Sequence, residues 1–164
     1  MTKRPLPGTT LELIIGKCAF GGDGIALHEG KVYFVEGALP GERILAGVTE
    51  EKKNFSRAVI LKILEPSSHR VDPPCPYVEH CGGCQYQHVD YREELRLKET
   101  QLAEIFRNMP GVSPEKIMPI AASDSDYGYR HSVTLHPVFS SPKGGSASGG
   151  KKKEFSPPGI YRQG

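Results

Sequence analysis

Short apolar runs alternate with polar residues between Thr10 and Leu64, and glycine-rich breaks separate them. Glu29-Gly30 is placed as a hairpin turn, residues 39–41 as a second break and residues 50–54 as a polar loop. Four or five short strands with turn signals at this interval predict an all-β sandwich or barrel, and a closed barrel hides its sheet edges most completely. The strand-like runs are residues 11–15, 25–28, 32–35, 43–48 and 57–64.

A helical pattern follows further along the chain, where apolar residues recur at spacings near three and four. Asp90 is the expected N-cap, and Glu93 three residues later resembles a capping box. Residues 108–111 (Asn-Met-Pro-Gly) are expected to end the helix. The apolar side chains on its predicted core-facing side are those of Tyr91, Leu95, Leu102, Ile105, Phe106 and Met109.

Three of the four cysteines lie close together, at Cys75, Cys81 and Cys84, with the spacing C-x5-C-x2-C. Prolines precede this cysteine segment (residues 75–84), and Gly82-Gly83 allows a tight turn within it. Soft thiolates favour iron–sulfur clusters or zinc, and both sites normally have four protein ligands. The remaining cysteine, Cys18, lies far upstream.

Two histidines, His80 and His88, are candidates to complete a zinc site, although His80 adjoins a cysteine and joint ligation of one ion by both is awkward. A redox CxxC pair is expected at the start of a helix directly after a strand, and that context is not visible here. The cysteine pattern alone therefore leaves iron–sulfur and zinc open.

The formal net charge of +2 is unevenly spread, because both ends of the 164-residue chain are mildly basic around an acidic middle. This small excess of positive charge is compatible with nucleic-acid binding but does not by itself indicate it. No apolar run approaches the roughly 18 residues of a membrane span, and the N-terminus lacks the apolar stretch of a signal peptide. We therefore expect a cytoplasmic protein without a membrane partner, in which clustered thiols are metal ligands rather than disulfides.

The order of residues from Gly21 to Glu42 closely resembles the TRAM domain, an OB-like RNA-binding barrel, most distinctively from Phe34 to the end of that run. The resemblance covers residues 10–64. A barrel of this type binds nucleic acid through a basic groove with aromatic rings on which bases stack. Phe34 and Val35 are expected in the core. The candidate RNA contacts are Lys17, Phe20, Lys31, Tyr33, Lys52, Lys53, Phe55 and Arg57.

The cysteine segment, with the Gln-Tyr-Gln-His that follows it, is similar to the iron–sulfur segment of the bacterial RNA uracil-5-methyltransferases that modify ribosomal RNA. A TRAM barrel precedes that segment in the family, as it does here. The resemblance implies that Cys75, Cys81 and Cys84 are three of the four ligands to a 4Fe–4S cluster. It puts the fourth ligand shortly after a run like Gly159-Ile160-Tyr161-Arg162, close to which this chain stops, and it gives Cys18 no ligand position.

The last segment resembles part of the family's central domain, beginning at the strand-like run Tyr127-Gly-Tyr-Arg-His, where His131 replaces the usual asparagine. Residues 140–153 are low in complexity and predict a flexible loop whose lysines are available to phosphates. The expected domains are a TRAM-like barrel (1–64), the cysteine loop with its helix (65–110) and an incomplete central domain (111–164). The predicted fold class is mainly β, with an α+β second part.

The predicted function is that of the RNA-binding N-terminal portion of an S-adenosylmethionine-dependent RNA uracil-5-methyltransferase, whose catalytic residues the resemblance places beyond this chain. Whether the chain itself is an enzyme is left open. The expected partner is RNA, specifically ribosomal RNA, bound by a monomer. The alternative is a stand-alone, non-enzymatic RNA-binding protein with a structural zinc site made by the three cysteines and a histidine.

Overall fold

The computed structural model describes residues 9–78, 81, 83–107 and 109–129. The chain divides into two compact units, residues 1–74 with 85–124 and residues 75–84 with 125–164. The first unit contains every strand and helix formed by the described residues. Residues 127–129, where a strand was expected to begin, form no strand, and the rest of that expected strand lies outside the described residues. The loop at 140–153 and the run at 159–162 also lie outside them.

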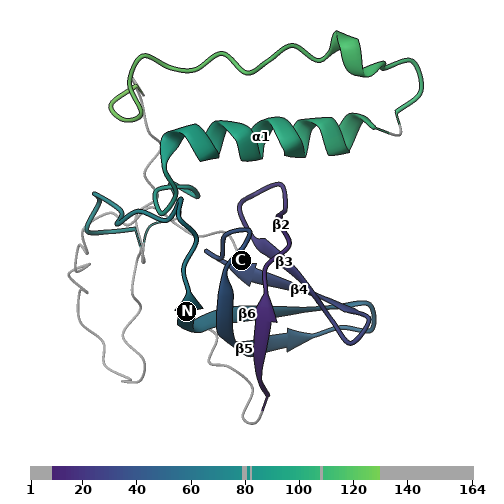
Figure 1. Ribbon diagram of the computed structural model, residues 1–164, viewed down its shortest axis with the longest axis vertical. Coiled ribbons are helices and arrows are strands. Elements are labelled where there is room, and N and C mark those ends of the chain that lie inside the picture. Colours follow the sequence, from purple (N-terminus) through teal and green to yellow (C-terminus); the bar gives the residue numbers. More distant parts are fainter. Residues whose placement is uncertain (1–8, 79–80, 82, 108, 130–164) are drawn as a thin grey trace, which may run out of the picture. The chain divides into compact units, whose positions relative to one another are not determined.

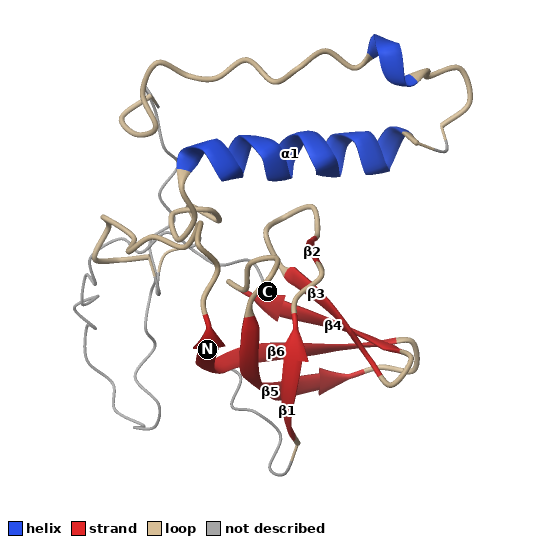
Figure 2. Ribbon diagram, in the orientation of Figure 1, coloured by secondary structure: helices blue, strands red, loops and turns tan. Residues whose placement is uncertain are grey.

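The described residues form one curved sheet of six strands (Figures 1 and 2). Its strand order is β1-β5-β6-β4-β3-β2, in which β4 and β6 are parallel and all other neighbours are antiparallel. The β-rich prediction is confirmed. The strands are β1 (Thr10–Ile14), β2 (Lys17–Cys18), β3 (Gly24–His28), β4 (Lys31–Glu36), β5 (Arg43–Glu51) and β6 (Phe55–Glu65).

The sheet is open, so the expectation of a closed barrel is corrected. Among the described residues, the edge strands β1 and β2 share no hydrogen-bonded ladder. These two strands follow one another directly in the chain. Strand β2 has only two residues, too few to pair along β1 and close a barrel. Gly16, just after β1, instead donates its backbone N–H to the carbonyl of Ile25 on β3 at 2.9 Å. The ends of the sheet therefore approach each other without closing it.

Alternation along the strands puts one set of apolar side chains into the sheet's core. Gly24 belongs to this interior, because a Cβ there would lie 2.7 Å from the carbonyl oxygen of Ala38. The predicted hairpin is also confirmed, since Glu29 and Gly30 both have positive φ and join β3 to β4. The core residues are Leu13, Ile15, Ala26, Tyr33, Val35, Ala38, Ile44, Ala46, Val48 and Ala58.

Helix α1 (Tyr91–Phe106) begins where the sequence predicts. Asp90 is its N-cap, and the carboxylate accepts the backbone N–H of Glu93 at 2.9 Å. The residues that α1 buries are Glu93, Leu97 and Gln101, which recur every four positions on one face. Leu97 packs with Cys18, Leu39 and Val89 in a second apolar cluster that joins the helix to the sheet.

The predicted core-facing stripe of α1 is not the buried side of the helix. Leu102, Ile105 and Met109 remain 42%, 49% and 46% exposed. Residues 111–124, which include the short 3-10 helix Pro114–Lys116, return along α1, and the N–H of Ile120 donates to Glu99 at 2.8 Å. Periodicity identifies two faces of a helix, but it does not say which face meets the sheet.

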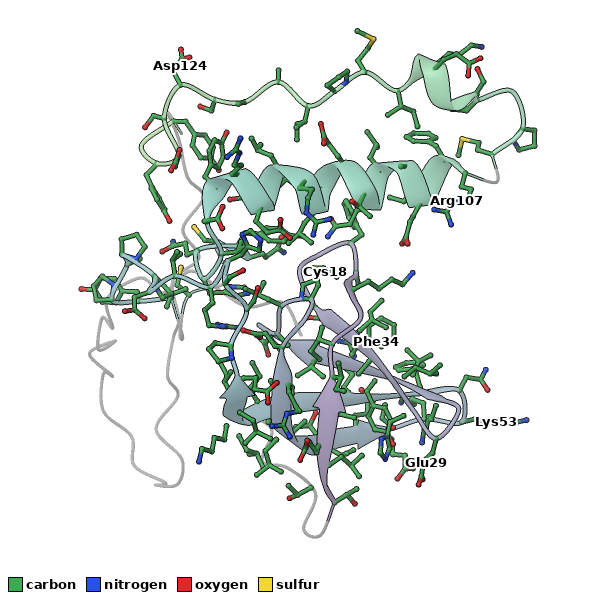
Figure 3. The ribbon with its side chains drawn as sticks, viewed as in Figure 1. Cys18, Glu29, Phe34, Lys53, Arg107 and Asp124 are labelled. Atoms are coloured by element: carbon green, nitrogen blue, oxygen red, sulfur yellow. The ribbon has the colours of Figure 1, made fainter. Side chains whose placement is uncertain are left out.

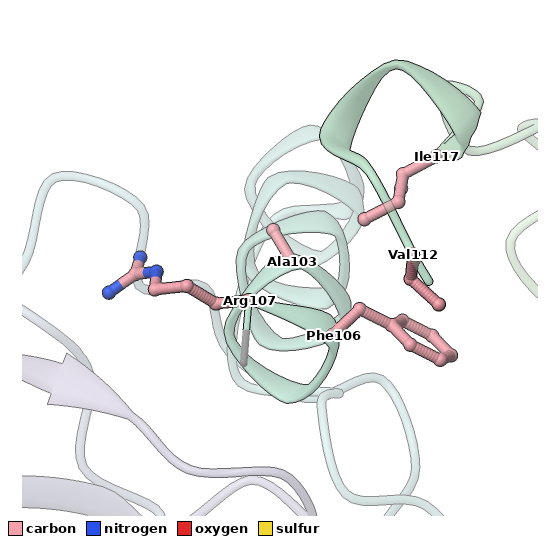
Figure 4. A pocket seen from close by; sticks show the side chains of 5 residues that line it. All are labelled: Ala103, Phe106, Arg107, Val112 and Ile117. Carbon is pink, nitrogen blue, oxygen red and sulfur yellow. The ribbon is translucent and has the colours of Figure 1, made fainter. Parts of the chain in front are cut away.

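An apolar pocket of about 160 Å³ lies at the end of α1, where Phe106, Val112 and Ile117 are on the same side and Arg107 points away from them (Figure 4). Ala103 completes its lining.

Within the described residues, no helix is long and apolar enough to cross a membrane.

Candidate nucleic-acid interface and cysteine segment

Outward-facing residues form a continuous row across five neighbouring strands, which we call the cross-strand row. Lys17 of β2 pairs with Ile25 of β3, and Ile25 pairs with Phe34 of β4. Phe34 then pairs with Arg57 of β6, which pairs with Glu50 of β5. Residues directly opposite each other share one face of a sheet, so these five side chains run in register across the outside of the fold. The row spans roughly 19 Å at the usual strand spacing.

The centre of this row is a cluster of two aromatic rings and a guanidinium. The Phe34 and Phe55 rings meet edge to face, with centroids 5.6 Å apart and an interplanar angle of 88°. The Cζ atom of Arg57 lies 6.0 Å from the Phe34 centroid, within cation–π distance. Figure 3 labels Phe34 on the sheet. We call Phe34, Phe55 and Arg57 the aromatic platform.

Two carboxylates flank the platform. Asp23, in the loop before β3, accepts from Nη1 of Arg57 at 3.2 Å, and Glu50 lies 3.8 Å from its Nε. Glu50 also pairs with Lys52 at 2.9 Å. The Arg57 side chain nevertheless remains 54% exposed. The platform is thus held in place from both sides and still open to a ligand.

Two of the other predicted basic contacts, Lys17 and Lys31, are also paired. Lys17 binds Glu104 of α1 at 3.1 Å, and Lys31 binds Glu51 at 2.7 Å. Lys53 is exposed in the loop between β5 and β6 (Figure 3). Exposed pairs of this kind contribute only about 0–1 kcal/mol, so RNA phosphates can replace the carboxylates at little cost.

The predicted aromatic contacts fall into different environments. Phe20 is 81% exposed in the loop after β2, and Phe55 is half-buried in the platform. Tyr33 is only 8% exposed and belongs to the core, so it offers no open ring face to a base.

The expectation that Phe34 lies in the core is wrong, and the missed signal is the two-residue period of a strand. Tyr33 and Val35 both point inward, which leaves Phe34 on the outer face.

A buried ion pair anchors the chain that leaves the sheet. Glu42 is fully buried, and Arg70 donates to its carboxylate from Nε at 2.5 Å and from Nη2 at 2.8 Å. The backbone N–H groups of Leu39 and Ser67 donate to the same carboxylate at 2.9 and 3.3 Å. Burial raises the pKa of Glu42, but the hydrogen bonds from Arg70 and Leu39 outweigh it, and the net pKa is lower than usual.

The chain segments on either side of the cysteine segment run antiparallel to each other. Val71 donates its N–H to the carbonyl of His88 at 3.1 Å, and Asp90 donates to His69 at 2.9 Å, around a bridge between Arg70 and Val89. Residues 69–71 and 88–90 therefore form a clamp that ties together the entry and the exit of the cysteine segment.

His88 in this clamp is largely enclosed, and its buried Nε2 has no hydrogen-bond partner among the described residues. Burial, reinforced by the nearby positive charge of Arg70, lowers the pKa of His88 to about 4. The imidazole is therefore neutral at physiological pH.

The described cysteines make local turns of their own. Val78 donates its N–H to the carbonyl of Cys75 at 3.3 Å, and Cys81 donates to Tyr77 at 2.8 Å. The N–H of Gly83 lies 3.4 Å from the Cys81 sulfur, a contact that suits a thiolate ligand. The donor chemistry fits a soft metal or cluster, but no group of three His, Cys, Asp or Glu side chains is gathered among the described residues. His80 lies outside them.

Cys18 has a different environment from the segment cysteines. It is 6% exposed, between the sheet and α1 (Figure 3), and burial raises the pKa of its thiol. The neighbouring Gln101 donates to the carbonyl of Ala19 at 3.0 Å and exchanges a hydrogen bond with Tyr86. Cys18 therefore packs in the apolar cluster at the junction of helix and sheet.

Comparison with known proteins identifies relatives of this chain. Residues 4–61 match the TRAM domain family. An uncharacterised RNA methyltransferase of Bdellovibrio bacteriovorus is 42% identical over 131 residues, which make up 80% of this chain and 33% of that protein. The 23S rRNA (uracil(1939)-C(5))-methyltransferase RlmD of Alkalilimnicola ehrlichii is 34% identical over 151 residues, 92% of this chain and 34% of that protein. The chain thus spans about a third of the length of these curated relatives.

A solved structure is also similar. The crystal structure of the Pyrococcus abyssi tRNA (uracil-54, C5)-methyltransferase in complex with S-adenosyl-L-homocysteine is 28% identical and aligns with 58% of this chain and 21% of that chain. The TM-score is 0.41.

Proposed function

Because this chain carries a TRAM domain and is homologous to the RlmD-type 23S rRNA uracil-5-methyltransferases, we propose that it is the RNA-binding portion of an RNA uracil-5-methyltransferase. The observation that carries the proposal is the TRAM match over a sheet whose outer face combines aromatic rings with exposed arginine and lysine side chains. Ribosomal RNA is the proposed substrate class, and S-adenosylmethionine is the proposed methyl donor.

The role of these residues in such an enzyme is to hold RNA while a target base leaves the stack. Methylation at C5 of uracil requires the base to be extruded, so RNA around it must be gripped elsewhere. Lys17, Lys52 and Lys53 are proposed to contact phosphates, and Phe20, Phe55 and Arg57 to contact bases. Stacking and phosphate contacts together suit single-stranded RNA.

RNA binding is tested by fluorescence anisotropy with single-stranded and duplex RNA over a salt series. We expect tighter binding to the single strand and an affinity that falls steeply with salt. A Lys52→Gln/Lys53→Gln double variant should bind less tightly and show a shallower salt dependence. Ile14→Ala, an exposed position on β1, is the matched control and should bind like the wild type. A wild-type protein that binds no RNA at low salt would contradict the proposal.

Cys75, Cys81 and Cys84 are proposed as ligands of a structural iron–sulfur cluster. The proposal rests on their spacing, their soft donor atoms and the N–H contact to the Cys81 sulfur. A bound cluster would supply a fixed point that ties the cysteine segment together, and no redox role is assigned to it.

The cluster is tested by anaerobic purification of the whole protein encoded by the gene, with a visible spectrum near roughly 400 nm and iron, sulfide and zinc analysis. Cys81→Ala should lose iron. Cys18→Ala should retain it, because Cys18 is buried against α1. Stoichiometric zinc without iron would support the alternative of a structural zinc site.

The enzymatic part of the proposal is tested in cells that lack the gene. Mass spectrometry of nucleosides from their ribosomal RNA should show a loss of 5-methyluridine, and the wild-type gene should restore it. Unchanged 5-methyluridine in that RNA would contradict the activity while leaving RNA binding to be judged by the anisotropy experiment.

A further inference from the structure

The aromatic platform has an electrostatic setting unlike that of a phosphate site. Arg57 lies between the carboxylates of Asp23 and Glu50, and Lys52 is itself paired with Glu50. The two positive and two negative charges of this cluster cancel. An RNA phosphate placed on Arg57 would lie beside both carboxylates and be repelled by them.

We propose that the Phe34–Arg57 pair stacks an unpaired RNA base that bears an exocyclic amino group, and that Asp23 and Glu50 accept hydrogen bonds from that group. The inference rests on the proposed RNA-binding function and adds a base preference to one part of the same surface. The preferred bases are adenine, cytosine and guanine, and the disfavoured base is uracil.

The stacking surface is held in position before any ligand arrives. Phe55 meets the Phe34 ring edge to face and fixes its orientation, and the Arg57 guanidinium lies over the ring. A guanidinium is planar and stacks on aromatic groups on either side, so ring, guanidinium and base form consecutive layers. The Asp23 and Glu50 contacts keep the guanidinium from swinging into solvent.

The base preference follows from what a carboxylate can do. The carboxylates of Asp23 and Glu50 accept hydrogen bonds and donate none. Adenine, cytosine and guanine each present an exocyclic NH₂ donor, whereas the corresponding edge groups of uracil are carbonyl oxygens, which are acceptors. A uracil at the platform would therefore bring its oxygens toward two negative charges. A donor–acceptor match of this kind is worth about fivefold or more in affinity.

The test measures the affinity of the whole protein for fluorescent oligo-A, oligo-C and oligo-U of equal length over a salt series. We expect oligo-A and oligo-C to bind about fivefold more tightly than oligo-U. Phe34→Leu and Arg57→Lys should each weaken oligo-A binding about fivefold, because stacking is lost while volume or charge is kept. Asp23→Asn/Glu50→Gln should reduce the preference for oligo-A over oligo-U.

The salt dependence separates base contact from phosphate contact. Losing one phosphate contact lowers the slope for single strands by about 0.7, so an unchanged slope is expected in Arg57→Gln, which removes the positive charge. Arg43→Lys is the matched control, since Arg43 also bridges two carboxylates, Glu12 at 2.7 Å and Glu65 at 2.5 Å. It should bind all three RNAs like the wild type.

Each outcome decides something different. Equal wild-type binding of the three RNAs overturns the base preference but leaves the proposed RNA-binding function intact. A lowered salt slope for Arg57→Gln would assign Arg57 to a phosphate and overturn the stacking assignment in the same way. Absence of any binding at low salt overturns the proposed function, and the platform assignment with it. Thermal denaturation of each variant distinguishes loss of contact from loss of fold, and Arg57→Lys, on the exposed face, supplies the decisive variant if Phe34→Leu unfolds.

Discussion

Glu42 is a buried carboxylate whose hydrogen bonds come from Arg70 and from two backbone N–H groups. Replacement by glutamine removes the charge and leaves the Arg70 guanidinium without its partner. Breaking a buried pair from one side is costly, so Glu42→Gln should lower the free energy of unfolding by about 3 kcal/mol. Urea unfolding followed by circular dichroism measures this change.

The matched control is Glu12→Gln. Glu12 also accepts from an arginine, Arg43 at 2.7 Å, but its side chain is 51% exposed. An exposed pair is worth less than about 1 kcal/mol. Equal losses in the two variants would show that burial of Glu42 has no energetic consequence.

His88 makes stability depend on pH. Its pKa is about 4 in the folded chain because it is buried near Arg70, whereas an unfolded histidine titrates near 6.5. Between these values the unfolded chain binds a proton that the folded chain does not, so stability falls as pH drops from about 6.5 to 4. The lowered pKa of Glu42 extends the loss at still lower pH, since protonation there also disfavours the folded state.

The measurement is the urea midpoint between pH 7 and pH 4. His88→Gln should flatten the dependence in the upper part of this range, because glutamine does not titrate. A midpoint that falls as steeply in the variant as in the wild type would assign the acid sensitivity to other groups.

At the scale of single residues, the sequence identified basic and exposed residues of the candidate interface. It did not identify the carboxylates that pair with them. Phe20 and Arg57 are exposed as their candidacy requires. Tyr33 was expected on the RNA-binding surface and Phe34 in the core, whereas Tyr33 is buried and Phe34 faces outward. The phase of the strand decides which of two adjacent aromatic residues points outward. That phase depends on pairing between distant strands, and composition alone does not set it.

At the scale of elements, helix α1 shows what local signals do determine. Its start at Asp90 follows from a side chain and a backbone N–H three residues apart, and both are visible in the sequence. Its docking face does not follow in this way. Glu93 and Gln101 lie on the buried side because Arg96 and the Ala19 carbonyl satisfy their polar groups. Polar residues can therefore lie on a packed face when their polar atoms have hydrogen-bond partners.

The cap can be tested separately from the docking. Asp90→Ala removes the acceptor of the Glu93 N–H and should cost about 1 kcal/mol. Faster hydrogen exchange should appear at the first turn of α1. Thr100→Ala, at an exposed position in the same helix, should cause no loss because alanine favours helix more than threonine. Unchanged exchange in Asp90→Ala would contradict the capping role.

At the scale of the whole molecule, the sequence predicted a β-rich first part followed by a helix, and the structure confirms that order. It did not predict an open sheet. Closure depends on how far the end strands extend, and β2 stops after two residues. The ion pair and the clamp were also missed, because they join residues that are 28 positions apart (Glu42 and Arg70) and 19 positions apart (Arg70 and Val89).

The clamp predicts how the molecule responds to loss of a metal. The Glu42–Arg70 pair and the bonds between residues 69–71 and 88–90 involve no thiol. Chelation, or Cys84→Ser, should therefore increase protease cleavage within residues 75–84 and leave the unfolding temperature of the sheet unchanged. Limited proteolysis with mass spectrometry and thermal denaturation measure the two effects. Simultaneous unfolding of the sheet would contradict this independence.

The same clamp has a consequence for how easily the cysteine segment can be ordered. Bringing distant thiols together in an open chain costs loop-closure entropy that grows with the length of chain between fixed points. Val71 and His88 are already hydrogen-bonded, so the stretch between them is a closed loop before any ligand binds. Contacts made outside the cysteine segment thus offset part of the entropic cost of gathering the three cysteines.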